Sequence, residues 1–120
     1  MITLYGLKNC DTCRKARRAL ASHNVDIHFV DLRAEGIDDQ QLDRFLHEAG
    51  WQRLLNKQST TWRSLDDNDK QNIDEAKARQ LLRNHPTLIK RPLLDSGESL
   101  VVGFDADRYV ALAEATKTSH

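Results

Sequence analysis

Cys10 and Cys13 are the residues best suited to covalent chemistry, because they are the only two cysteines of the sequence and stand three positions apart. A strand-like run, Ile2–Tyr5, precedes them and a basic helical pattern follows. We therefore expect Cys10 at the N-terminus of a helix, where unpaired backbone N–H groups and the helix dipole stabilise a thiolate and lower its pKa. Cys13 would lie one turn further on and could attack a mixed disulfide at Cys10, so the pair is typical of a thioredoxin-type redox motif.

Two other uses of the cysteine pair stay open at this point. A structural zinc site takes four ligands, and beside the pair the sequence offers only five scattered histidines, so we expect no metal. Free cysteines are also often small buried hydrophobic residues without chemistry. The redox interpretation leads because the pair stands between a strand and a basic helix.

The length of the chain indicates a single domain, residues 1–115, with a frayed C-terminal tail at 116–120. The 120 residues carry 18 basic and 18 acidic side chains, which gives no electrostatic reason to expect nucleic acid or a membrane surface as a partner. The first residues lack the pattern of a signal peptide, and no apolar stretch approaches the roughly 20 residues that span a bilayer. We expect a cytoplasmic monomer, whose thiols are kept reduced.

The order of the expected elements is β-α-β, then a mainly helical insertion, then β-β-α. The opening unit favours parallel strands with a right-handed crossover. Asp38, Asp74 and Asp105 have the character of helix N-caps. The expected strands are 2–5, 25–30, 87–94 and 99–102, and the expected helices are 11–23, 38–49, 74–84 and 106–115, with short helices and a loop between 51 and 72 and a turn at 95–98. This is the order of an α/β thioredoxin-like fold with a central mixed four-stranded sheet and an insertion at about 38–84.

Three groups of residues give the chain a resemblance to the arsenate reductase-like (ArsC/Spx) family, and within it to the YffB branch. They are Ile2–Gly6 with Lys8–Thr12, Leu54–Asn56 with Thr60–Arg63, and Ile89–Leu94 followed by Val102–Phe104. These motifs follow one another in the family's order and cover nearly the whole chain.

The resemblance implies roles for five positions. Cys10 falls on the family's nucleophilic cysteine, Arg91 on an arginine that binds substrate beside the thiolate, and Pro92 on a cis-proline that follows this arginine. Arsenate reductases of the family hold the oxyanion with two further arginines, and Asn56 and Gly103 stand at those positions here. Because lost cations weaken the stabilisation of an anionic transition state, we expect arsenate to be a poor substrate.

The remaining candidates for substrate binding lie around the cysteines and in the insertion. Lys8 or Arg14 would attract an anionic thiol such as glutathione, although much of the basic helix face, Arg17 and Arg18 included, is expected to be solvated. Backbone N–H groups of Asp11 and Thr12 would surround the thiolate. Arg63 would replace one missing cation of the arsenate site.

The sequence therefore predicts a thiol-disulfide oxidoreductase of the ArsC/YffB type, with Cys10 as nucleophile. We expect no bound cofactor, glutathione as co-substrate and glutaredoxin as a further partner. Either Cys13 or glutathione would resolve the intermediate. Two alternatives remain: a redox-sensing regulator of the Spx type, which binds RNA polymerase through its alpha subunit, and a true arsenate reductase.

Overall fold

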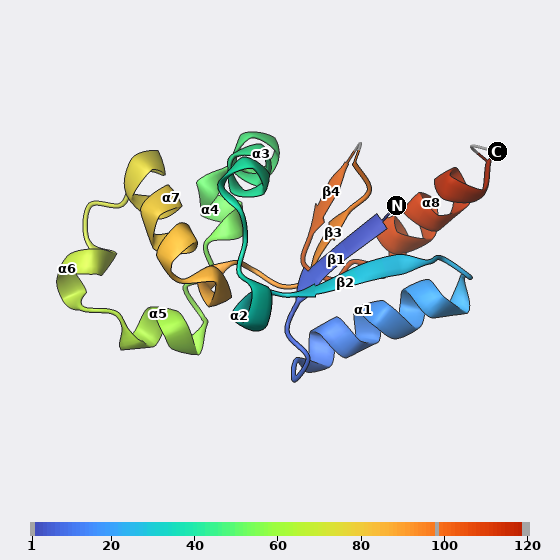
Figure 1. The fold of residues 1–120 in the computed structure, drawn as a ribbon, viewed down its shortest axis with the longest axis horizontal. Coiled ribbons are helices and arrows are strands. Elements are labelled where there is room, and N and C mark those ends of the chain that lie inside the picture. Colours follow the sequence, from blue (N-terminus) through green and yellow to red (C-terminus); the bar gives the residue numbers. More distant parts are fainter. Residues whose placement is uncertain (1, 98, 119–120) are drawn as a thin grey trace. The chain divides into compact units, whose positions relative to one another are not determined.

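The computed structural model describes residues 2–97 and 99–118 (Figure 1). The elements in chain order are β1 (Ile2–Gly6), α1 (Asp11–Ser22), β2 (Ile27–Asp31), α2 (Leu32–Glu35), α3 (Asp39–Ala49), α4 (Trp51–Leu54), α5 (Thr60–Ser64), α6 (Asp67–Lys70), α7 (Glu75–Asn84), the 3₁₀ turn η1 (Pro86–Leu88), β3 (Leu93–Asp95), β4 (Leu100–Val102) and α8 (Ala106–Thr118). The chain forms two compact units. The sheet unit consists of the residues up to Asp31 and from Arg91 onward, and the helical unit is Leu32–Lys90.

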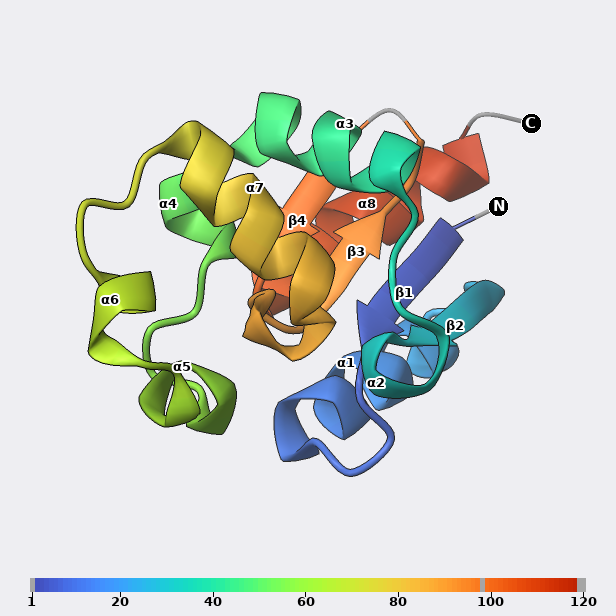
Figure 2. The ribbon, with the colours of Figure 1, turned by 60° about the vertical axis from the view of Figure 1, so that its left-hand side comes forward.

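The sheet unit is built on a mixed four-stranded sheet in the order β2-β1-β3-β4 (Figure 2). Strands β1 and β2 are parallel, whereas β1 with β3 and β3 with β4 are antiparallel. Leu4 in the central strand lies opposite Phe29 on one side and Leu94 on the other. The predicted β-α-β opening, β-β-α ending and mixed sheet are therefore confirmed.

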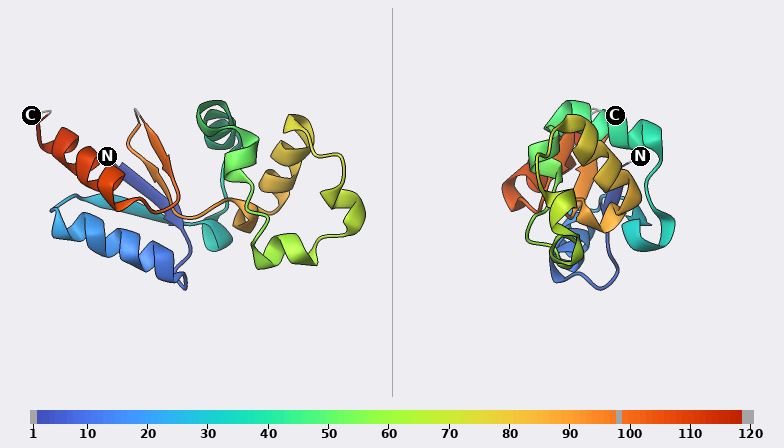
Figure 3. Two further views of the ribbon diagram at one scale, coloured as in Figure 1. Left: turned by 180° about the vertical axis from the view of Figure 1, so that it is seen from behind. Right: turned by 90° about the vertical axis from the view of Figure 1, so that its left-hand side faces the viewer.

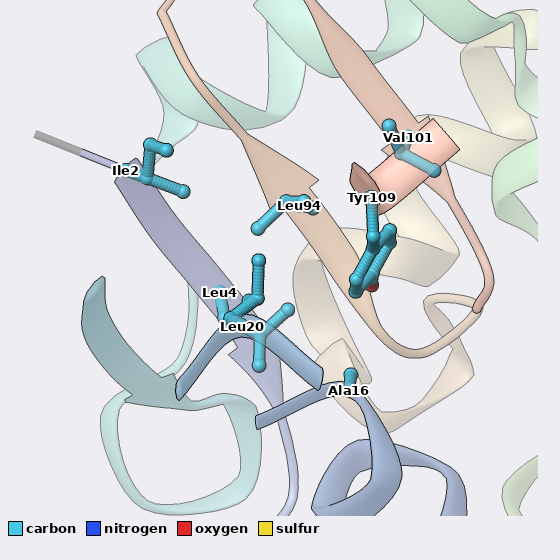
Figure 4. Close-up of a cluster of buried hydrophobic side chains, with 7 residues drawn as sticks. All are labelled: Ile2, Leu4, Ala16, Leu20, Leu94, Val101 and Tyr109. Carbon is cyan, nitrogen blue, oxygen red and sulfur yellow. The ribbon is translucent and has the colours of Figure 1, made fainter. Parts of the chain in front are cut away.

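One face of this sheet carries the core that fixes α1 in place. Figure 4 shows seven buried side chains in this cluster, which come from the strands and from helices α1 and α8: Ile2, Leu4, Ala16, Leu20, Leu94, Val101 and Tyr109. Side chains alternate between the two faces of a strand, which places Ile2 and Leu4 together. Burying an aliphatic side chain of this size contributes roughly 1.5–3 kcal/mol. Leu20 and Ala16 thus anchor the helix whose first turn follows Cys10.

The helical unit packs around large side chains that are fully buried, among them Leu42, Phe45, Leu54 and Leu82. The two predicted N-caps in this unit are confirmed, since the carboxylates of Asp38 and Asp74 accept bonds of 2.8 and 2.9 Å from backbone N–H groups of α3 and α7. Figure 3 shows the short helices α5 and α6 on the segment between α4 and α7, as the sequence predicted for 51–72. Within the described ranges, no helix is long and apolar enough to cross a membrane.

The second strand begins at Ile27, two residues later than the alternating pattern predicted. The backbone N–H of Val25 still bonds to the carbonyl of Leu20 at 3.1 Å, so the turn that ends α1 extends to this residue. Asn24 within that turn has a φ of 58°, a conformation that asparagine tolerates better than most residues.

The prediction of an extended segment over residues 87–94 is wrong for the first half of this range. Residues Pro86–Leu88 form a 3₁₀ turn, and β3 occupies only Leu93–Asp95. Proline suits the first position of a helical turn because its φ is already fixed there and its missing N–H is not needed.

The last helix is longer than predicted. Helix α8 continues to Thr118, so residues 116–118, which were expected to fray, are helical. The last two residues of the predicted tail, 119 and 120, lie outside the described residues.

Tyr109 is a polar side chain in the core of the sheet unit. It is 1% exposed, and its ring meets Phe104 edge to face at 5.1 Å between centroids. The pKa of its phenol is raised, chiefly by burial and further by the nearby Cys13 thiol and the Asp105 carboxylate. The buried hydroxyl has no hydrogen-bond partner among the described residues.

We predict that Tyr109→Phe stabilises the protein. An unpaired buried polar group costs roughly 1–3 kcal/mol, and the phenylalanine ring keeps the packing. A gain of about 1 kcal/mol would raise the Tm by about 4 °C, measurable by thermal denaturation followed by circular dichroism. A lower Tm for the variant would mean that the hydroxyl has a stabilising role.

Candidate active site

Cys10 is the N-cap of α1, as the sequence predicted. Its backbone is extended, with φ −120° and ψ 118°, and helical geometry begins at Asp11. The Cys10 sulfur accepts a hydrogen bond of 3.4 Å from the backbone N–H of Cys13. The N-cap position places the sulfur beside unpaired N–H groups at the positive end of the helix. Cys10 as a residue is partly exposed.

The surroundings of Cys10 lower the pKa of its thiol. Partial burial by itself raises the pKa, but hydrogen bonds from the Cys13 side chain and backbone, the charge of Arg91 and the N–H of Thr12 together outweigh it. These groups favour the thiolate, which is the nucleophilic form of cysteine. Cys10 therefore has the electrostatic environment of a reactive cysteine.

Cys13 is held in the opposite state. It is fully buried, and burial, its hydrogen bond to Cys10 and the charge of Cys10 raise the pKa of its thiol to about 12. Cys13 is therefore a protonated donor toward the Cys10 sulfur. The two cysteines of the motif thus have different chemistry although they are only one turn apart.

Gly6, at the end of β1, lies directly against Cys13. A Cβ atom at Gly6 would stand 2.6 Å from the Cys13 sulfur and 3.3 Å from its Cβ. Real Cβ atoms do not approach other atoms so closely, so the absent side chain makes room for the Cys13 sulfur. In the sequence analysis this glycine appears only within a family motif, although its position just before the cysteine pair is a usable signal.

Asp31 fixes the loop that carries Cys10. This aspartate ends β2 directly opposite Gly6, is buried, and accepts a hydrogen bond of 3.3 Å from the backbone N–H of Lys8. Sequence reasoning missed Asp31. The available signal was an acidic residue at the carboxyl end of a strand parallel to β1, where loops of α/β sheets meet.

Arg91 and Pro92 lie in the same unit as Cys10. The peptide bond between them is cis, which confirms the isomer implied by the resemblance. Pro92 is buried, and its carbonyl accepts a hydrogen bond of 2.9 Å from the N–H of Gly103. The Arg91 charge is close enough to lower the pKa of Cys10. A positive charge thus acts on the Cys10 sulfur, and the same charge would attract an anionic group of a substrate.

The candidate residues around the cysteine pair have distinct roles. The exposed Asp11 carboxylate pairs with Arg14 and thereby holds its guanidinium at the first turn of α1; this ion pair lowers the pKa of Asp11. Thr12 acts on Cys10 through its backbone N–H. Lys8 is exposed, and its backbone rather than its side chain has a described partner.

Arg63 belongs to the helical unit, in α5, and its guanidinium donates to the carbonyl of Gln58 at 3.3 Å. Asn56, one of the two positions without the arginine of arsenate reductases, is in the same unit and accepts a bond of 3.0 Å from the N–H of Gln58. The role of Arg63 in substrate binding stays a prediction.

The described residues contain no candidate metal site. In residues 2–97 and 99–118, no three His, Cys, Asp or Glu side chains gather in an arrangement that would hold a metal ion. The absence of a metal stays a prediction from the sequence.

The Arg91 charge can be tested by its effect on thiol reactivity. Arg91→Gln should raise the pKa of Cys10 and slow its alkylation by iodoacetamide several-fold at pH 7, because a nearby positive charge favours the thiolate. Arg91→Lys keeps the charge and should retain most of the rate. Equal alkylation rates in all three proteins would contradict the electrostatic role of Arg91.

Fold and site together define a thioredoxin-like α/β protein with a stabilised thiolate at a helix N-terminus. The ArsC family model matches residues 5–112, and the chain belongs to the ArsC family. The predicted resemblance to this family, including its YffB branch, is confirmed.

Similar proteins carry names of different kinds. A solved structure named YFFB protein is 47% identical, with a TM-score of 0.88 and coverage of 92% of this chain and 97% of that one. The structure of an arsenate reductase (ArsC) related protein from Brucella melitensis is 44% identical, with a TM-score of 0.72 and coverage of 92% of each chain. The global transcriptional regulator Spx 1 of Oceanobacillus iheyensis is 29% identical over 112 residues, which are 89% of this chain and 82% of that protein.

Proposed function

We propose that the protein is a thiol-disulfide oxidoreductase that uses Cys10 as nucleophile and glutathione as co-substrate. One observation carries the proposal: Cys10 is a partly exposed helix N-cap whose pKa is lowered, while its partner Cys13 is buried and stays protonated. The asymmetry gives the site one attacking sulfur and one supporting donor, which is what nucleophilic thiol chemistry requires.

The proposed reaction starts from a mixed disulfide of glutathione with another thiol. The Cys10 thiolate attacks the glutathione sulfur, the disulfide bond breaks, and the other thiol leaves as a thiolate that takes a proton from water. Cys10 is then joined to glutathione. The thiolate of a second glutathione attacks the glutathione sulfur of this adduct, which releases oxidised glutathione and restores the Cys10 thiolate.

Glutathione is favoured over Cys13 as the resolving thiol. Burial is the largest cause of the raised pKa of Cys13, and it persists when Cys10 is in a disulfide. With a pKa of about 12, only about one in 10⁵ Cys13 side chains would be ionised at pH 7 in the reduced protein, since each pKa unit is tenfold. The thiol of glutathione in solution is not buried, so a larger fraction of it is ionised at pH 7.

Turnover of a small glutathione mixed disulfide tests this proposal. In an assay coupled to glutathione reductase, the wild-type protein should turn over, Cys10→Ser should fall to the background rate, and Cys13→Ser should keep activity. Mass spectrometry after mild oxidation with glutathione should show the adduct on Cys10. Absence of turnover by the folded wild type would refute the proposal, and an internal Cys10–Cys13 disulfide in place of the adduct would make Cys13 the resolving thiol.

Arsenate is a second substrate that separates this proposal from arsenate reduction. Asn56 and Gly103 stand where arsenate reductases of the family place arginines, so two charge-assisted contacts are missing, each worth roughly 1.5–3 kcal/mol. We expect arsenate turnover to be far below that of the mixed disulfide. Efficient arsenate reduction in a glutaredoxin-coupled assay would show that another residue, such as Arg63, supplies the charge.

A redox-sensing regulator is the second candidate function, because a relative named global transcriptional regulator matches most of the chain. A regulator of this kind would show no turnover and would co-purify with RNA polymerase.

A further inference from the structure

A groove of about 490 Å³ runs along one side of α1 in the sheet unit. Its lining combines two chemistries. Arg14, Arg17 and Arg18 of the helix provide positive charge, and Val25, Ile27 and Phe29 provide an apolar wall. We call this feature the arginine groove. Its volume lies within the range of small ligand sites, which are roughly 300–1,000 Å³.

The local structure explains why these residues meet. Residues three and four apart share one side of a helix, so Arg14, Arg17 and Arg18 lie together. Ile27 and Phe29 are two apart in β2, on the same face of the sheet as the core residues that they oppose in β1. The Arg17 guanidinium lies over the Phe29 ring, 4.6 Å from its centroid. This contact orients a cation within the groove rather than leaving it mobile in solvent.

The positive charge of the groove is only partly neutralised. Arg14 is paired with Asp11. For Arg17 and Arg18, no acidic side chain within ion-pair distance is found in the part of the chain that the structure describes. Two cations beside a partly exposed apolar wall complement a ligand that has both carboxylates and an apolar side chain.

The groove leads away from the reactive sulfur. Cys10 directly precedes α1. The groove-lining residues of the helix follow it at intervals of three or four positions, first Arg14, then Arg17 and Arg18, then Ala21. At a rise of about 1.5 Å per residue, these residues lie roughly 6–16 Å along the axis from Cys10. An extended chain advances about 3.3 Å per residue. The groove therefore matches residues about two to five positions from a cysteine held at Cys10.

Glutathione alone does not account for this length. It has a single residue on either side of its cysteine, and even its γ-linked glutamate spans only about two residue lengths, so when it is bound at Cys10 it covers only the near part of the groove. The distant part of the groove, at Arg17, Arg18 and Phe29, requires a longer chain.

We propose that the arginine groove binds the acidic segment next to the cysteine of a protein substrate, so that the substrate class is protein cysteines joined to glutathione. This inference rests on the proposed function and follows the same reaction. The Cys10 thiolate attacks the glutathione sulfur, and the protein cysteine leaves as a thiolate that takes a proton from water. The segment in the groove holds one or two carboxylates against Arg17 and Arg18 and an apolar side chain against Ile27 and Phe29.

The test compares three substrates, each a mixed disulfide with glutathione. The first is a peptide that has acidic residues and a leucine at two to five positions from its cysteine. The second has lysines in place of the acidic residues and keeps the leucine. The third is the glutathione mixed disulfide of mercaptoethanol. Exposed ion pairs are individually weak, so the wild type should prefer the acidic peptide over the lysine peptide by about fivefold to tenfold in kcat/KM. Added salt should weaken this preference.

The variants separate the groove from the reactive site. The double variant Arg17→Gln/Arg18→Gln should lose the preference for the acidic peptide and keep the wild-type rate on the mercaptoethanol disulfide. Lys15→Gln removes an exposed cation of the same helix that does not line the groove, and should keep both. Equal rates on the two peptides, or a double variant that slows all three substrates alike, would overturn the inference.

A binding measurement makes the inference independent of turnover. The acidic peptide with serine in place of cysteine, carrying a fluorophore, should bind the wild type and Lys15→Gln and bind the double variant about fivefold to tenfold more weakly. Binding without turnover of any disulfide would refute the proposed function and leave the groove assigned to an acidic segment. Turnover of the mercaptoethanol disulfide with no binding and no preference would refute the groove alone.

Discussion

Iodoacetamide is expected to modify Cys10 about a hundred times faster than Cys13 at pH 7. The thiolate is the reacting form, and each pKa unit changes its fraction tenfold. A thiolate of higher pKa is, however, the stronger nucleophile, which offsets roughly half of this factor on a logarithmic scale. The pKa of Cys13 is raised to about 12, whereas the pKa of Cys10 is lowered from the ordinary value of a cysteine. The full burial of Cys13 adds to the difference. Peptide mass spectrometry at successive times gives both rates.

The pH dependence of this reaction has a defined sign. Because the folded state lowers the pKa of Cys10, its alkylation rate should rise with pH and reach its midpoint below the value of about 8.5 for a free cysteine. The protein in urea provides the control, since both cysteines should then react alike and with an ordinary midpoint. Similar rates for the two thiols in the folded protein would end the assignment of Cys10 as nucleophile.

The position of Cys10 could be predicted from the sequence because its causes are local. A strand, a glycine and a cysteine pair followed by a helical pattern all occur within about twenty residues, and a cap is determined by the residues next to it. The proximity of Arg91 has a different origin. Arg91 is far from Cys10 in sequence, so only the family resemblance suggested it, and the antiparallel pairing of β1 with β3 supplies the physical reason.

Other features of the site depend on packing that no periodic pattern contains. The sequence analysis expected Arg17 and Arg18 to be solvated, since a helix with several cations is usually amphipathic with a charged outer face. The edge strand β2 brings Phe29 beside Arg17 and turns part of that face into a groove. Likewise, Asp31 gains its partner only because β2 is in register with β1, which places it opposite Gly6. Such contacts require knowledge of register, which the alternation of residues does not provide.

Gly6→Ala is expected to destabilise the protein by about 1–3 kcal/mol, the usual cost of inserting a methyl group into a closely packed site. The new Cβ would stand 2.6 Å from the Cys13 sulfur, and neither partner has room to move freely. Gly6 ends β1, a central strand with β2 along one edge and β3 along the other. Cys13 is fully buried in the first turn of α1. Urea denaturation of the variant and the wild type gives the difference in the free energy of unfolding.

A double-mutant cycle with Cys13→Ala identifies the cause. Without the sulfur, the nearest remaining contact of the new methyl group would be the Cβ of residue 13 at 3.3 Å, which a small adjustment can relieve. Gly6→Ala should therefore cost clearly less in the Cys13→Ala background, and the difference is the coupling between the two positions. If the cost were the same in both backgrounds, the glycine would be needed for its backbone and not for the sulfur.

The same substitution also tests the link between packing and reactivity. A methyl group at Gly6 has to push the Cys13 sulfur away from its place, and with it the thiol that donates to Cys10. Because this hydrogen bond is one of the contacts that lower the pKa of Cys10, the folded Gly6→Ala protein should react more slowly with iodoacetamide at pH 7 than the wild type. Gly36→Ala places a Cβ that meets no atom within 4 Å but on a backbone with a φ of 70°, so it should cost some stability and still leave the rate at Cys10 in the folded protein unchanged. An unchanged rate in Gly6→Ala would mean that the backbone N–H groups and Arg91 stabilise the thiolate without help from Cys13.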